Sequence, residues 1–178
     1  MAGPVAITVN LGDLGKLEKK LGSRLNLVLR RASLSAAMRS VAYMQQRTRT
    51  AMPANPSGIG SGGAVNTGAY LRAWRTGQSP QGASVYNSSK YAGVIELGRR
   101  TGKVPPREAI ARWAQRRLGL DEKDARAAAY PIARAIARRG LVGRYVMTAP
   151  EAMRKMADFF VEEFEKELDK VLSESAGR

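Results

Sequence analysis

The sequence contains no cysteine and no histidine in its 178 residues. It therefore has no disulfide, no thiol nucleophile and no histidine general base, and a zinc site of the usual kind is excluded. Acidic residues are also scarce before residue 151, and no paired carboxylates or Ser–Lys arrangement stands out. The closest approach to a metal pair is Asp121 with Asp124, which the first turn of a helix explains better. The sequence predicts no enzyme, no catalytic residue, no metal and no cofactor.

Long apolar runs are missing too. No stretch approaches the roughly 18 uninterrupted apolar residues of a membrane span, and the start of the chain has no signal-peptide pattern. We expect a soluble protein with no membrane contact. Aromatic residues make up only 6% of the chain, and much of its 44% apolar content is alanine. Because alanine buries little area, the core should be thin, and neighbouring subunits should supply part of the burial.

Charge is abundant and uneven. The net charge is +15, from 30 basic and 15 acidic residues. Residues 151–178 carry five bases and eight acids, whereas residues 1–150 carry 25 bases and seven acids. This distribution fits contact with nucleic acid, a solvated arginine-rich surface, or a basic body that meets the acidic tail of a neighbour.

Helical periodicity dominates the pattern. Leu14, Leu17, Leu21, Leu25, Val28 and Ala32 recur every three or four residues, which predicts a helix from about Asp13 to Thr50. Two more helices are expected after Pro106 and after Asp121, the second kinked or split at Pro131. A last helix should begin at Pro150.

Short strands are expected at residues 5–9 and in a hairpin that pairs residues 71–74 with residues 83–86. Residues 53–66 are rich in Pro, Gly and Ser and predict a flexible loop that either tethers the chain or orders on a partner. The predicted fold is α+β and mostly helical, with a long N-terminal helix and a C-terminal helix packed around a small antiparallel sheet. The predicted regions are an α+β domain over residues 1–150 and an amphipathic acidic helix over residues 151–178.

Two features of the sequence indicate contacts, a single acid in an apolar segment and an apolar stripe on the last helix. Glu96 lies between Ile95 and Leu97, so it is either a buried acid paired with an arginine (Arg72, Arg75 or Arg99) or a solvent-facing residue. The stripe on the last helix predicts an assembly interface, formed by Met153, Met156, Phe160 and Phe164.

The middle of the chain resembles a known signature. The motif has three parts in order: it begins with Thr-Gly followed by Leu-Arg, continues with a short strand, and ends with Tyr-Ala-x-x-x-Glu-x-Gly. The order and spacing of these parts resemble those of phage neck and tail-completion proteins, the family related to minor tail protein Z. The residues that carry the resemblance are Thr67, Gly68, Leu71, Arg72, Trp74, Tyr91, Ala92, Glu96 and Gly98.

The resemblance covers about residues 25–145. It implies a structural virion protein of a tailed phage, at the head–tail junction, assembled in the host cytoplasm. Its implied partners are copies of itself in a ring, head-connector and tail proteins, and DNA in passing. It also implies that Gly68 and Gly98 permit tight turns, that Trp74 and Tyr91 fill a small core, and that Glu96 holds an arginine. The alternative reading of the charge is a basic DNA-binding accessory protein.

Overall fold

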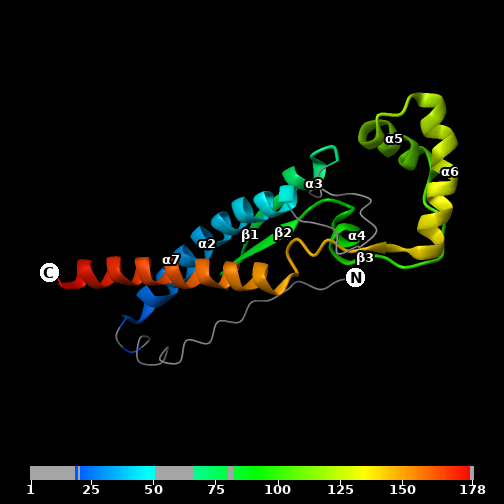
Figure 1. Ribbon diagram of the computed structural model, residues 1–178. Helices are drawn as coiled ribbons and strands as arrows, with labels where there is room; N and C mark the ends of the chain where they lie inside the picture. Colours follow the sequence, from blue (N-terminus) through cyan, green and yellow to red (C-terminus); the bar gives the residue numbers. More distant parts are fainter. Residues whose placement is uncertain (1–18, 20, 51–65, 80–81, 177–178) are drawn as a thin grey trace. The chain divides into compact units, whose positions relative to one another are not determined.

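The structure is a computed structural model that describes residues 19, 21–50, 66–79 and 82–176. The expected strand at residues 5–9, the helix cap at Asp13 and nearly all of the 53–66 loop lie outside the described residues. The described chain is α+β and mostly helical, as the sequence predicts, with a long early helix, a long last helix and a small antiparallel sheet (Figure 1). It forms two compact units.

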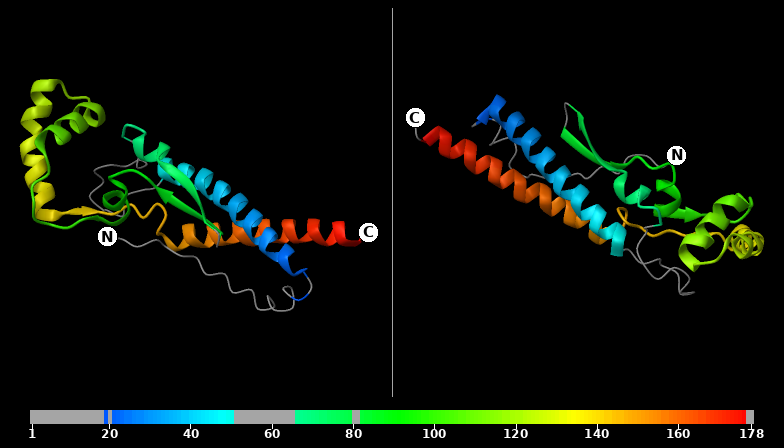
Figure 2. Two further views of the ribbon diagram at one scale, coloured as in Figure 1. Left: turned by 180° about the vertical axis from the view of Figure 1, so that it is seen from behind. Right: turned by 90° about the horizontal axis from the view of Figure 1, so that it is seen from above.

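Unit 1 comprises the chain up to Arg47, Ala73–Ser88 and the part from Val146 onward. It contains α2 (Ser23–Thr50, except its last turn), the strands β1 (Trp74–Ser79) and β2 (Gly82–Asn87), and α7 (Pro150–Ala176). In Figures 1 and 2, α2 and α7 lie side by side over much of their length. The last helix is thus part of unit 1, and the division of the chain does not fall at the predicted boundary after residue 150.

The seam between α2 and α7 is the larger apolar cluster of unit 1. The stripe that the sequence identified on the first helix packs here against the stripe of the last one. Buried members from the two helices are Leu21, Leu25, Val28, Ala32, Phe164 and Val171, with Leu29, Phe160, Leu168 and Leu172 partly buried beside them.

The predicted hairpin exists, but its first strand begins later than expected. Ala69–Arg72 forms one helical turn, α3, and β1 starts only at Trp74. The register pairs Trp74 with Asn87 and Ser79 with Gly82, antiparallel throughout. Gly77 lies within β1 and pairs with Ser84, whose Oγ would lie 2.8 Å from a Cβ at this position.

Unit 2 comprises Thr48–Arg72 and Ser89–Tyr145. After α3 it contains α4 (Ala92–Leu97), β3 (Gly98–Arg99), α5 (Arg107–Leu118), α6 (Glu122–Arg139) and β4 (Leu141–Val142). The two short strands pair antiparallel, Gly98 with Val142 and Arg99 with Leu141. Helices α5 and α6 pack through Ala111, Ala114, Ala125 and Ala129, a thin core of the kind that the composition predicts.

The ends of α6 follow the sequence signals, but its middle does not. The Asp121 carboxylate accepts a hydrogen bond from the Asp124 backbone N–H at 2.8 Å and caps the helix, and Gly140 ends it with φ +73°. Of the kink or split expected at Pro131, the split is absent, since α6 is one helix from Glu122 to Arg139. Pro131 and Ala127, whose carbonyl loses its helical partner, are both exposed, so water can replace the missing hydrogen bond.

Candidate functional site

The signature residues are divided between the two units. Trp74 belongs to unit 1, where its side chain is only 2% exposed and acts as a core residue, as the resemblance implies. The other signature residues belong to unit 2, where they flank α3 and α4: Thr67, Gly68, Leu71, Arg72, Tyr91, Ala92, Glu96 and Gly98.

Glu96 is the centre of the unit 2 group. Its residue is 7% exposed, so the solvent-facing alternative is wrong. The Tyr70 hydroxyl donates a hydrogen bond to Glu96 Oε1 at 2.6 Å, a partner that the sequence analysis, which named only arginines, did not include. Burial and this hydrogen bond raise the pKa of the Tyr70 phenol well above its usual range, so the phenol remains a donor. The bond joins α3 to α4.

The same segment also holds the chain that follows β4. The Ile95 carbonyl accepts from the Arg144 backbone N–H at 2.7 Å, and the Glu96 carbonyl accepts from the Tyr145 N–H at 3.2 Å. Gly98, with φ +77°, lies so close that a Cβ would be 2.1 Å from the Leu141 carbonyl oxygen. Glycine is therefore required at this signature position both by conformation and by space.

The entry to the signature is a tight turn. Gly68 has φ +75°, and the Arg72 backbone N–H donates to its carbonyl at 2.9 Å. The Arg72 guanidinium also reaches back to the Thr67 carbonyl at 3.1 Å. Tyr91 departs from the implied role, since it is 57% exposed and fills no core. It directly precedes α4 as its N-cap residue.

The predicted assembly stripe on α7 is largely covered within the chain. Met156 and Phe164 are buried, while Met153 and Phe160 are partly buried, and Phe160 and Phe164 pack against the apolar side chains of α2. The physical reason is that α2 carries a matching apolar stripe, so it takes the place expected for a neighbouring subunit. The outer surface of these helices keeps single exposed apolar residues, such as Met38 and Val161.

Ion pairs also connect α2 to α7. Arg39 on α2 donates to Glu163 and to Glu162 of α7, each at 2.7 Å, and its guanidinium lies 4.4 Å from the centre of the Phe159 ring. Hydrogen bonds from Lys166 and Arg39 lower the pKa of the Glu163 carboxyl. Arg47 pairs with Glu151 at 3.0 Å, and Arg31 approaches Glu167 at 3.9 Å. Much of the acidity of the last helix is thus neutralised by its own chain.

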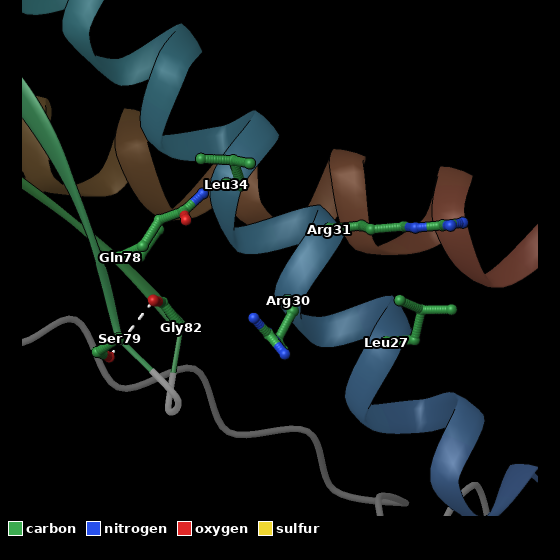
Figure 3. Close-up of a pocket in the computed structure, with 8 residues that line it drawn as sticks. Leu27, Arg30, Arg31, Leu34, Gln78, Ser79 and Gly82 are labelled. Carbon is green, nitrogen blue, oxygen red and sulfur yellow. Dashed lines mark hydrogen bonds between the residues drawn. The ribbon is translucent and has the colours of Figure 1, made fainter.

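An open groove of about 280 Å³ lies between α2 and the tip of the β1–β2 hairpin. In Figure 3, Arg30 and Gln78 point toward this space, and Arg31 points away from it. Two arginines, one amide and one hydroxyl line the groove among apolar groups, without an acid among the lining residues, so it offers no set of groups for catalysis. Across the described residues, no cluster of three carboxylates is close enough to hold a metal ion.

Positive charge gathers in unit 2. Over the sequence assigned to it, unit 2 has 16 basic and five acidic residues, a net charge of +11, whereas unit 1 has 14 and ten, a net charge of +4. Burial, and to a smaller extent the nearby Arg117, lower the pKa of the Arg144 guanidinium. The difference between the two units adds to the larger one predicted from the sequence, between residues 1–150 at +18 and residues 151–178 at −3.

Comparison of the chain with protein-family models, with curated proteins and with solved structures finds no match. Among the described helices, none combines the length and apolar character needed to cross a membrane.

Proposed function

We propose that this chain is a structural component of a tailed-phage particle, a neck or tail-completion protein that joins the head connector to the tail. The observation that carries the proposal is the packing of the signature. The Thr-Gly entry and the Tyr-Ala-x-x-x-Glu-x-Gly close, more than 20 residues apart in sequence, meet through the buried Tyr70–Glu96 hydrogen bond.

The arrangement also supports a structural role rather than a catalytic one. Glu96, the one acid singled out in the sequence, is buried and bonds to a neighbouring helix. Its carbonyl and that of Ile95 fix the segment after β4. A carboxylate used in this way shapes the subunit, and the sequence supplies neither histidine nor cysteine to act beside it.

The presence and position of the chain in phage particles test the proposal directly. Tailed particles released from the strain that encodes the chain should contain it, and gold-labelled antibody should mark the junction of head and tail. The purified chain should form a closed ring in native mass spectrometry. Particles that assemble and infect without the chain would overturn the proposal.

A pair of variants links the particle to the signature. The gene is deleted from the phage, and a wild-type or variant copy is supplied in trans. The Glu96→Ala copy should lower the yield of particles with joined head and tail at least tenfold, because an unpaired Tyr70 hydroxyl distorts unit 2. Val94→Ala, at a 42% exposed position on the same helix, should support normal yields.

A basic DNA-binding accessory protein is the second candidate function. The +11 charge of unit 2 favours it. It predicts salt-sensitive DNA binding by a chain that is absent from finished particles.

A further inference from the structure

The strongest unassigned feature is a cluster of cations at the C-terminal half of α6. Two segments meet there, residues 98–107 and residues 130–140, and neither contains an acidic residue. The Gly102 backbone N–H donates to the Ala137 carbonyl at 2.7 Å, and Gly140 lies against the Arg99 carbonyl. The exposed cations of these segments form what we call the basic patch: Arg100, Lys103, Arg107, Arg134, Arg138 and Arg139.

An aromatic ring organises part of the basic patch. The Arg107 guanidinium lies 4.4 Å from the centre of the Tyr130 ring, and that of Arg134 lies 5.8 Å from it. These contacts bring a cation from the start of α5 next to one in α6. Arg134 and Arg138 are then one helical turn apart on the same face. The ring limits the freedom of the two guanidinium groups, so less entropy is lost when an anion binds them.

The patch has no internal counter-charge. None of its six cations forms an ion pair within the described part of the chain, although acids elsewhere do pair, as Glu122 does with Arg126. The helix dipole accounts for cations in the last turn, Arg138 and Arg139. It does not account for Arg100, Lys103 and Arg107, which precede α5 or begin it.

Two kinds of partner could neutralise such a surface, and the structure favours one. The acidic helix α7 of a second copy is a poor match, because Glu151, Glu162, Glu163 and Glu167 already pair with cations of their own unit. A nucleic-acid backbone offers an unbroken row of phosphates to which arginine donates readily. Contacts to phosphates carry no sequence information, so a surface that makes only these contacts does not distinguish one duplex from another.

We propose that the basic patch binds the phosphate backbone of DNA without sequence preference. The inference does not rest on the proposed function, because it concerns a surface of unit 2 whether or not the chain belongs to a particle. Neutralising up to six phosphates should give a slope of log K against log salt near −5, from about −0.9 for each phosphate.

The test compares two variants of equal charge in the full chain. Arg134→Gln/Arg138→Gln removes two neighbouring cations of the patch and keeps good helix formers. Arg154→Gln/Lys155→Gln removes two exposed cations from α7 in unit 1. Binding to a fluorescent duplex of random sequence is measured between 0.05 and 0.3 M salt, and circular dichroism verifies the fold of each variant.

The patch variant should bind roughly 60-fold more weakly at 0.1 M salt, with a slope smaller by about 2, as the loss of two phosphate contacts requires. The α7 variant should bind within about threefold of the parent, and unrelated duplexes should compete equally. Equal weakening in both variants would overturn the proposal, since total charge would then govern binding. So would a failure of the parent chain to bind at 0.05 M salt, or a change of oligomeric mass in the patch variant with DNA binding unchanged.

Discussion

The buried hydrogen bond between Tyr70 and Glu96 determines how two short helices of unit 2 pack. Glu96 is buried, and its carboxylate accepts a hydrogen bond from a phenol that burial keeps protonated. Burying such an acid without a donor would cost several kcal/mol. The pair therefore specifies how α3 meets α4 in unit 2.

Removal of the Tyr70 hydroxyl tests this pair. Tyr70→Phe should lower the free energy of unfolding by about 2 kcal/mol, the usual effect of losing a hydrogen bond to a charged group. Tyr91→Phe, at the 57% exposed tyrosine of the same unit, should change it by less than about 0.5 kcal/mol. Urea denaturation measures both. Equal, small losses would mean that the hydrogen bond contributes nothing to stability.

The sequence could indicate that Glu96 is unusual, but not which way it faces. Its neighbours Ile95 and Leu97 suggested an apolar segment, yet Leu97 is 55% exposed and Ile95 is partly buried. In a helix the neighbours point about 100° to either side, so the acid can face inward while they do not. Ala92, four residues earlier, shares its face. Its tyrosine partner is 26 residues away in sequence, beyond the reach of any local pattern.

At the scale of elements, the seam between α2 and α7 carries much of unit 1. The periodicities of both helices were predicted correctly from sequence, including buried Leu25, Val28 and Phe164. Their pairing was not predicted, because an amphipathic stripe shows that a helix needs a partner without identifying it. The ion pairs of Arg39 with Glu162 and Glu163 were missed for the same reason.

A side-chain substitution in α7 tests whether its apolar stripe packs within one chain or between two chains. Phe164→Ala should lower the free energy of unfolding by about 3 kcal/mol, since it leaves a cavity at a position only 5% exposed. Val161→Ala, at a 38% exposed position of the same helix, should cost less than about 0.5 kcal/mol.

The control is to repeat the unfolding measurement at low and high protein concentration. The loss at Phe164 should be the same in dilute and concentrated samples, because the contacts lie within one unit. A loss seen only at concentrations where the chain oligomerises would assign Phe164 to an interface between copies.

For the whole molecule, the uneven charge of the two units predicts an uneven response to salt. Unit 2, at +11, should be destabilised by self-repulsion, and unit 1, at +4, much less. Each unit has one tryptophan, Trp74 in unit 1 and Trp113 in unit 2. Raising the salt from about 0.05 to 0.5 M should raise the melting temperature reported by Trp113 by roughly 5 °C.

Single-tryptophan variants separate the two signals. Trp74→Phe leaves the reporter in unit 2, and Trp113→Phe leaves the one in unit 1. Only the shift with salt is compared, because replacing the buried Trp74 changes the absolute melting temperature. Equal shifts from both reporters would show that the charge of unit 2 does not limit its stability.

The separation of α2 from α7 along the chain has a consequence for synthesis. Arg39 and its partner Glu163 are 124 residues apart, whereas α5 and α6 are adjacent. At a translation rate of about 5–20 residues per second, α2 leaves the ribosome roughly 6–25 seconds before the helix that covers it. During that interval Leu25 and Val28 have no partner from α7, while the α5–α6 pair can already form. The apolar face of the first long helix is therefore exposed longer during synthesis than that of the α5–α6 pair.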